Sequence, residues 1–271
     1  MSGDGPRRAL PAELLARLPF FCGPRCLLAF DFDGTLAPIV SHPVEAALPA
    51  GARERLARLA ERRTCAVLSG RALADVRARL AGVPLAALAG NHGAELWVAA
   101  RAAGELAHHG APQEPVERMV ARVAGWAAQL AASLAGLPGV RVEDKRLSLS
   151  VHYREARDPD RARRAIEAAT AALHGARAFG GHCVVNVVGA HAPCKGDALA
   201  TLLARLSCDA ALYVGDDLTD EDVFLRAGAL PLLGVRIGPV EHTAAEFTLP
   251  SYALLEPLLD ALLDCVSRAS A

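Results

Sequence analysis

A short apolar run that ends in two aspartates constrains the fold of this chain more than any other feature. Cys26 to Phe30 are expected to form a buried strand, and Asp31-Phe32-Asp33-Gly34-Thr35-Leu36 follows directly. The carboxylates therefore emerge at the carboxyl end of a strand, where open α/β sheets bind their ligands. Strand alternation predicts that Asp31 and Asp33 point the same way, and Gly34 allows a sharp turn after them.

Two carboxylates this close together need a counter-charge. A hard divalent cation such as Mg²⁺ supplies one, because oxygen ligands suit it and its charge removes the repulsion between the acids. Taken alone, the Asp-x-Asp pattern is equally well explained as a solvated turn with side-chain-to-backbone hydrogen bonds. The rest of the chain has to decide between these two interpretations.

The alternation of helix and strand repeats along the sequence. Helices are expected over 51–63, 72–80, 195–206 and 252–267, and strands over 64–68, 84–89, 210–214, 232–237 and 246–249. Three of these strands run into polar turns: Ser69-Gly70-Arg71, Gly90-Asn91-His92-Gly93 and Gly215-Asp216-Asp217-Leu218-Thr219-Asp220-Glu221-Asp222. This order predicts an α/β fold with a Rossmann-like parallel sheet and ligand groups along one edge.

The middle of the chain has a different pattern. It contains an amphipathic helix over 115–137, an alternating strand over 140–154, a charged helix over 159–174 and two short β segments that end near 188. Strands separated by long helices within one insertion indicate a small α/β cap domain. We therefore expect a core made of 1–104 and 190–271, with an inserted cap over 105–189.

Four positions at the expected sheet edge carry chemistry: Asp31 with Asp33, Ser69, Lys195 at a helix start, and the acidic run that contains Asp216, Asp217 and Asp220. Each has a structural alternative, since Ser69 could cap a helix, Lys195 could be a solvated charge, and the acidic run could cap a helix near Asp220. Together they suit phosphoryl transfer, in which acids bind Mg²⁺ while a hydroxyl and an ammonium hold phosphoryl oxygens.

The two aspartates of the opening motif can divide this chemistry between them. One carboxylate attacks phosphorus to form an acyl phosphate, and the other protonates the leaving alcohol and later activates water. Their order along the chain assigns Asp31 as the nucleophile and Asp33 as the acid/base, although the reverse assignment is also chemically possible.

Composition narrows the choice of ligand and cellular location. The formal net charge of -1 offers no broad attraction for nucleic acid or an anionic membrane, so we expect a small-molecule ligand and no nucleic-acid or membrane partner. We also expect a monomer. The seven cysteines are odd in number and scattered, which favours a reducing compartment. No apolar run approaches a transmembrane length, and the first residues lack the apolar region of a signal peptide, so a cytoplasmic protein is expected.

The motifs Asp31 to Leu36, Ser69-Gly70-Arg71, Lys195-Gly196 and Gly215 to Asp222 together resemble those of the haloacid dehalogenase-like (HAD) phosphatases. Within that superfamily the chain is similar to the trehalose-6-phosphate phosphatases of trehalose biosynthesis. The further motifs that carry this similarity are 33–39, the 90–93 turn, Glu143-Asp144-Lys145 with Ser148, and His152-Tyr153-Arg154.

This resemblance implies a magnesium site and a sugar-phosphate substrate. Mg²⁺ would be bound by Asp31, the backbone carbonyl of Asp33 and Asp216, with Asp220 nearby, and whether Asp217 or Asp220 is a direct ligand stays open. Phosphate would be bound by Ser69 and Lys195. The cap would open and shut, with Glu143 and Lys145 against the sugar, while Arg71 and His92 frame the substrate from the core.

Two positions differ from the family pattern. Asn186 stands where the family usually has a glutamate that helps to hold the disaccharide, and Arg146 stands beside Lys145 where a glycine is usual. We expect Asn186 to contact the sugar, but it lacks the charge and the reach of a glutamate. A related disaccharide or pseudo-disaccharide (aminocyclitol) phosphate is therefore the alternative substrate.

Three further questions stay open at this point. Hydrolytic dehalogenation would use the same nucleophile without a metal, and a sugar-phosphate sensor would bind without turnover. His152 lies two residues before Arg154 on an expected cap strand, so both face the same way, towards either the substrate or the cap's own core.

Overall fold

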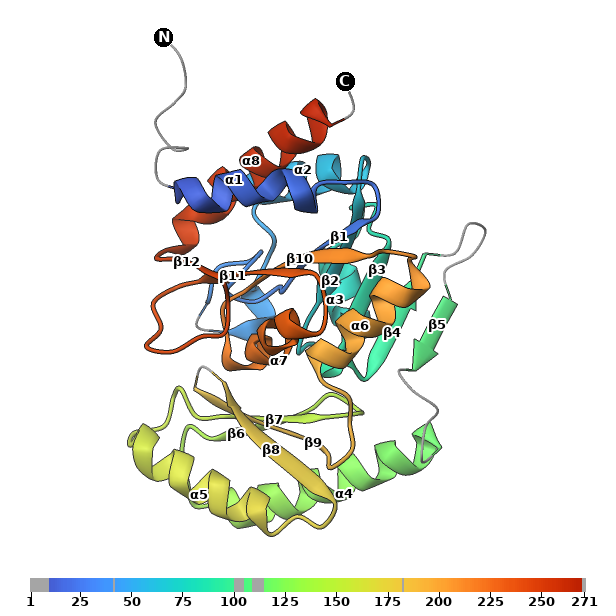
Figure 1. Ribbon diagram of the computed structural model, residues 1–271. Helices are drawn as coiled ribbons and strands as arrows, with labels where there is room; N and C mark the ends of the chain where they lie inside the picture. Colours follow the sequence, from blue (N-terminus) through green and yellow to red (C-terminus); the bar gives the residue numbers. More distant parts are fainter. Residues whose placement is uncertain (1–9, 41, 100–104, 109–114, 182, 270–271) are drawn as a thin grey trace. The chain divides into compact units, whose positions relative to one another are not determined.

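The computed structural model describes residues 10–40, 42–99, 105–108, 115–181 and 183–269. The chain divides into two compact units. The first contains the residues up to Ala107 and those from Cys194 onward, and the second contains His108–Pro193. Each unit has its own sheet and its own helices (Figure 1). Within the described ranges, no helix is long and apolar enough to cross a membrane.

The first unit is built around an eight-stranded sheet with the order β12-β11-β10-β1-β2-β3-β4-β5. Its strands are β1 (Cys26–Phe30), β2 (Thr64–Leu68), β3 (Ala87–Gly90), β4 (Glu95–Val98), β5 (Glu105–His108), β10 (Ala210–Gly215), β11 (Leu232–Ile237) and β12 (Phe247–Leu249). The pairs from β12 to β3 are parallel, whereas β4 runs antiparallel to β3. The carboxyl ends of six neighbouring strands therefore share one edge of this sheet.

Helices cover both faces of the core sheet. They are α1 (Ala12–Phe21), α2 (Ala50–Ala60), α3 (Leu73–Arg79), α6 (Lys195–Arg205), α7 (Glu221–Phe224) and α8 (Leu255–Arg268). Strand alternation divides the core, because Leu28 and Phe30 of β1 pack with α1, α2, α3 and α8, while Leu27 and Ala29 pack with α6 and α7. Figure 1 shows α1, α2 and α8 on one side of the sheet and α6 and α7 on the other.

Short 3₁₀ segments complete the first unit: η2 (Pro43–Glu45), η3 (Asn91–Gly93), η4 (Leu218–Asp220), η5 (Leu225–Gly228) and η6 (Tyr252–Leu254). Two of them follow strands at the edge where the parallel strands end. Segment η3 comes directly after β3, and two residues separate the end of β10 from the start of η4. They shape the turns that carry the predicted site residues.

The second unit is a four-stranded antiparallel sheet covered by two helices. The strand order is β6-β7-β9-β8, with β6 (Arg141–Asp144), β7 (Leu149–His152), β8 (Ala176–Gly181) and β9 (Val184–Gly189). Helices α4 (Val116–Leu134) and α5 (Pro159–Ala171) pack on one face through a cluster that includes Trp126, Ile166, Val151 and Val187. The alternate positions of β7 and β9, Ser150 and Asn186, are polar.

Two parts of the secondary structure differ from the sequence expectation. The single strand expected over 140–154 is a hairpin, because the chain turns between β6 and β7 with Lys145 N donating to Ser148 O and with Arg146 at a positive φ of 70°. Helix α1 and the strands β4 and β5 were not expected from the sequence. Strands β1, β2 and β11 have the bounds predicted from their apolar runs.

Candidate active site

The predicted site residues lie at neighbouring strand ends of the first unit. Asp31 follows β1, Ser69 follows β2, and Asp216 follows β10, the three adjacent parallel strands at the middle of the sheet. The backbone N–H of Asp31 donates to the carbonyl of Val214 at 2.8 Å, which continues the pairing of β1 with β10 beyond the strand. Parallel register therefore brings these side chains to one point of the sheet edge.

Lys195, the first residue of α6, links two of the carboxylates. Its Nζ donates to Asp31 Oδ1 and to Asp220 Oδ1, both at 2.7 Å, and the residue is only 2% exposed. Burial alone would lower the pKa of Lys195, but Asp220 and Asp31 outweigh it and raise the pKa above its usual range. Lys195 is thus a buried ammonium, and the solvated-charge alternative is wrong.

The acidic residues around Lys195 carry more negative charge than this one ammonium offsets. Burial, and then the charges of Asp220 and Asp216, hold the pKa of Asp31 well above its usual value, while Lys195 opposes the shift. Burial, Asp220 and Asp217 likewise raise the pKa of Asp216 to about 7. A bound cation would oppose both shifts, because it favours the charged form of each carboxyl.

Three of the carboxylates can meet at one ion. Asp31, Asp216 and Asp220 each offer an oxygen, and these oxygens lie within 4.8 Å of one another. An all-oxygen donor set of carboxylates is the set that a hard divalent cation prefers. The residues present therefore fit a metal ion of this class. Asp33 is not part of this group.

Asp220 already accepts from four donors. Its Oδ1 accepts from Lys195 Nζ and from the hydroxyl of Tyr213 at 2.6 Å, and its Oδ2 accepts from the backbone N–H groups of Asp216 and Asp217 at 2.9 Å each. A carboxylate offers about four lone-pair positions, so a directly bound metal would have to displace one of these donors. The arrangement favours Asp220 as the residue that organises the acidic loop. The acidic run also caps a helical segment, since Asp217 and Asp220 form a capping box on η4, but Asp220 makes no side-chain cap on α7, the helix that begins next to it.

Gly34 allows the turn after Asp33 to pass close to the acidic loop. Its φ is +88°, and a Cβ at this position would lie 1.9 Å from Asp216 Oδ2. Only glycine combines this backbone conformation with such a close approach. The next residue, Thr35, donates from its hydroxyl to Asp216 Oδ1 at 3.0 Å.

Asp33 has a different environment from Asp31. Arg71 holds both of its oxygens, with Nε and Nη2 each 2.7 Å from the carboxylate, and the Asp33 side chain is 43% exposed. The third nitrogen of the guanidinium, Nη1, donates to Asp75 Oδ2 at 2.7 Å. Arg71, which the resemblance assigns to the substrate, is thus joined to Asp33, the expected acid/base.

Ser69 and His92 lie next to each other, and Ser69 contacts the backbone of Arg71. Ser69 is buried, and its Oγ accepts from the backbone N–H of Arg71 at 3.1 Å. It does not cap α3, whose N-cap is Ala72. The backbone N–H of His92 donates to the carbonyl of Ser69 at 3.0 Å, and the His92 ring lies so close to Gly70 that a Cβ there would be 2.4 Å from Cε1.

The polar face of the second unit carries two of the predicted sugar contacts, Glu143 and Asn186, while Lys145 lies in the turn that follows β6. Strand register aligns Glu143, Ser150 and Asn186 in one row across β6, β7 and β9. Ser150 Oγ donates to Asn186 Oδ1 at 2.7 Å, and both residues are buried. His152 Nε2 lies 2.7 Å from Glu143 Oε2, and this hydrogen bond is the main cause that lowers the pKa of Glu143 to about 2. Burial opposes the shift, and the charges of neighbouring cations add to it. The side chain of His152 thus belongs to this polar face.

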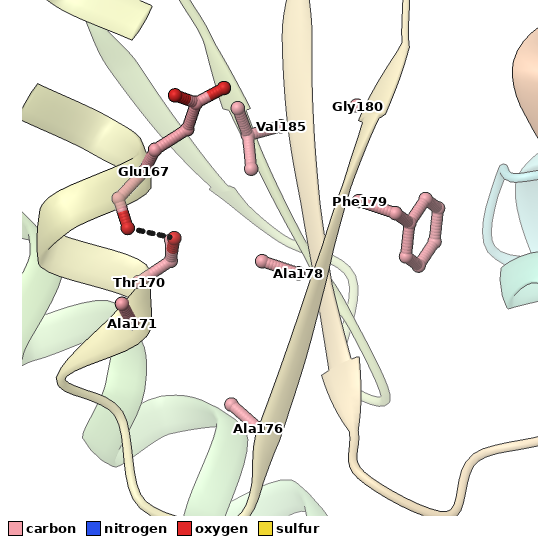
Figure 2. Close-up of a pocket in the computed structure, with 8 residues that line it drawn as sticks. All are labelled: Glu167, Thr170, Ala171, Ala176, Ala178, Phe179, Gly180 and Val185. Atoms are coloured by element: carbon pink, nitrogen blue, oxygen red, sulfur yellow. Dashed lines mark hydrogen bonds between the residues drawn. The ribbon is translucent and has the colours of Figure 1, made fainter. Parts of the chain in front are cut away.

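A cavity of about 390 Å³ lies on the other face of this sheet, between α5 and β8. Figure 2 shows Glu167, Thr170 and Ala171 of α5 on one side of the cavity, with the ring of Phe179 pointing away from that helix. Within this lining, the hydroxyl of Thr170 donates to the carbonyl of Glu167 at 3.0 Å. The described residues that line it carry no converging catalytic groups, so the acidic cluster of the first unit remains the candidate active site.

Sequence reasoning missed three contributors to these networks: Tyr213, Asp75 and Ser150. Tyr213 offered a signal, because a phenol within the apolar run of β10 needs a hydrogen-bond partner. Asp75 lies four residues after Arg71 and four before Arg79, a spacing that favours helical ion pairs. Ser150 offered no signal beyond its place in an alternating strand.

The similarity of this chain to known proteins agrees with the geometry of the site. The family model described as "Trehalose-phosphatase" matches residues 29–253. A trehalose-phosphate phosphatase of Mycobacterium avium is 38% identical over 260 residues, which cover 88% of this chain and 62% of the relative. The one from Mycobacterium tuberculosis H37Rv is also 38% identical, over 86% of this chain and 60% of its own length. The chain thus spans about three fifths of the length of these relatives.

The fold is also that of solved structures. The C-terminal domain of trehalose-6-phosphate phosphatase from C. albicans superposes with a TM-score of 0.75 at 23% identity, and the match covers 96% of this chain and 97% of that one. An Aspergillus fumigatus trehalose-6-phosphate phosphatase gives a TM-score of 0.61 at 25% identity, covering 94% and 98% of the two chains. The α/β core with a separate antiparallel sheet is common to all of them.

Proposed function

The chain belongs to the trehalose-phosphatase family, and we propose that it hydrolyses trehalose 6-phosphate to trehalose and phosphate through an aspartyl-phosphate on Asp31. One observation carries this proposal: the buried ammonium of Lys195 lies 2.7 Å from Asp31 Oδ1, beside two more carboxylates at the sheet edge. A nucleophile held in this way is oriented, and the electrostatic environment suits a transferring phosphoryl group.

The two proposed chemical steps use the opening aspartates in turn. An oxygen of Asp31 attacks phosphorus, and the bond to the sugar oxygen breaks as that oxygen takes a proton from Asp33. Water then gives a proton to Asp33 and attacks the aspartyl-phosphate, which releases phosphate and restores the Asp31 carboxylate. The burial of Asp31 and the partial exposure of Asp33 support this assignment over the reverse one. Ser69 and Lys195 are proposed to bind phosphoryl oxygens.

We propose Mg²⁺ as the metal, held by Asp31, Asp216 and the backbone carbonyl of Asp33, with Asp220 organising the loop around it. The convergence of the Asp31 and Asp216 carboxylates, with Asp220 beside them, supports this choice. When bound, the ion would offset the negative charges of the carboxylates and the phosphoryl group.

Metal removal tests this site. Treatment with EDTA should abolish phosphate release, and added Mg²⁺ should restore it. Mg²⁺ at a hundredfold excess over its Kd should also stabilise the folded protein by about 2.7 kcal/mol, visible as a rise in Tm. Asp216→Asn should lose this rise. Full activity in EDTA would contradict the metal site and would favour the metal-independent dehalogenase chemistry instead.

We propose that Glu143, Lys145 and Asn186 of the second unit bind the sugar, that this unit is the cap, and that Arg71 and His92 frame the substrate. The hydrogen bond between Ser150 and Asn186 favours the alternative substrate over trehalose 6-phosphate. With its oxygen engaged, the amide of Asn186 presents donors where a glutamate would present acceptors. A related disaccharide or an aminocyclitol pseudo-disaccharide phosphate, with acceptor groups at this position, would suit that arrangement.

A substrate panel with Asn186→Glu separates the two substrates. For trehalose 6-phosphate we expect the variant to lower KM by about tenfold, because a charged hydrogen bond to a sugar hydroxyl contributes roughly 1.5–3 kcal/mol. Asn186→Gln, which adds reach without charge, should stay close to the parent protein. A parent protein that prefers a pseudo-disaccharide phosphate would overturn trehalose 6-phosphate as the substrate. Binding of every sugar phosphate without phosphate release would identify a sensor.

A further inference from the structure

We propose that Asp75 is a positioning residue for Asp33 and acts through Arg71. The inference rests on the proposed role of Asp33 as the acid that protonates the leaving sugar oxygen. Asp75 itself touches neither the acidic cluster nor, in this proposal, the substrate.

The contacts of Arg71 carry the first step of the argument. Two of its nitrogens hold the two oxygens of Asp33 and the third holds Asp75, all at 2.7 Å. The Arg71 side chain is 10% exposed, and its Cζ lies 5.6 Å from the ring centroid of Phe32. A planar guanidinium held on two edges by carboxylates has a fixed orientation.

A second arginine anchors Asp75 in turn. Arg79 Nε donates to Asp75 Oδ1 at 2.9 Å, and the Arg79 guanidinium also donates to the carbonyls of Ala46 and Val44. Burial would raise the pKa of Asp75, but the hydrogen bonds from Arg71 and Arg79 outweigh it and lower the pKa. An ionised Asp75 thus connects Asp33 to the backbone of the 44–46 segment.

This chain of contacts matters because proton transfer depends on position. A general acid has to lie within hydrogen-bond distance of the oxygen that it protonates, about 2.6–3.2 Å. Without the charge of Asp75, Arg71 would keep its two bonds to Asp33 but would lose the contact that stops the pair from swinging together. Asp33 would then spend less time at the position where it gives up its proton.

Leaving groups of different basicity test this inference. Trehalose 6-phosphate loses a sugar alkoxide, which needs a proton, whereas 4-nitrophenyl phosphate loses a phenolate that departs without one. We expect Asp75→Asn to lower kcat/KM for the sugar phosphate at least tenfold and to lower it for 4-nitrophenyl phosphate less than threefold. For each substrate, kcat/KM reports the steps up to cleavage of the phosphate ester. A general loss of structure would lower kcat/KM equally for the two substrates.

Three variants make the result interpretable. Asp260→Asn is the matched control, because Asp260 is 37% exposed, similar to Asp75 at 41%, and pairs with Arg55 on another helix; it should leave both values unchanged. Asp33→Asn should give a larger difference between the two leaving groups than Asp75→Asn. Arg79→Gln removes the second anchor and should give a smaller difference in the same direction, even where Asp75→Asn folds poorly.

The outcomes separate the inference from the function on which it rests. Asp33→Asn alone could show the leaving-group difference, while Asp75→Asn and Arg79→Gln lower kcat/KM for both substrates equally or for neither. In that case Asp75 is not a positioning residue, and the proposed function stands. If Asp33→Asn itself shows no such difference, the acid role of Asp33 fails, and the inference fails with it.

Discussion

Asp31→Asn should lower phosphate release by roughly four orders of magnitude or more, since loss of a nucleophile removes the covalent route altogether. The amide has nearly the size of the carboxylate but cannot attack phosphorus. Lys195 keeps Asp220 as a partner in the variant, so we expect it to fold. Phosphate release at saturating trehalose 6-phosphate, with folding followed by circular dichroism, measures the effect.

The position of the covalent intermediate provides an independent check on this prediction. Rapid acid quenching of the parent enzyme during turnover, followed by mass spectrometry of peptides, should find one phosphoryl group on Asp31. Asp209→Asn is the control, because Asp209 forms an exposed surface pair with Arg25 and should retain full activity. A phosphoryl group on Asp33 would establish the reverse assignment of nucleophile and acid/base.

Lys195→Met should cause the largest loss of stability. The variant leaves Asp31 and Asp220 buried without the ammonium that both accept from. Breaking a buried pair in this way costs about 3–5 kcal/mol, whereas Arg25→Met, which removes only the exposed Arg25–Asp209 pair, should leave the stability almost unchanged. Urea unfolding in the absence of metal measures both variants, and equal stability of Lys195→Met and the parent would contradict the buried pairing.

The cost should depend on pH. The pKa of Asp31 is already raised by burial, and removal of Lys195 raises it further, so a proton can neutralise this carboxyl in the variant. A group whose pKa is raised by folding stabilises the folded state at low pH and loses that contribution as pH rises. We therefore expect the destabilisation of Lys195→Met to be larger at pH 8 than at pH 5.

Much of the core fold was predictable because its strands are short, apolar and bounded by polar turns. Strand β1 keeps the expected bounds, and alternation divides its side chains between two helical layers. The hairpin of β6 and β7 was missed, although the apolar positions change phase across the charged residues 143–146, from Val142 to Leu147. The chain reverses there through the hydrogen bond from Lys145 N to Ser148 O and the positive φ of Arg146. Local patterning identifies strands more readily than it identifies such reversals.

The sequence by itself determined which chemical groups lie at the sheet edge, because strand ends and the residues after them are local properties of the chain. Asp31, Ser69 and Asp216 were found in this way, and Lys195 was found as the first residue of a helix. Only the tertiary structure decided which groups pair. Lys195 and Asp31 are 164 residues apart, and Arg71 and Asp33 are 38 apart. Such contacts depend on strand order, register and the reach of each side chain, which a periodic pattern does not encode.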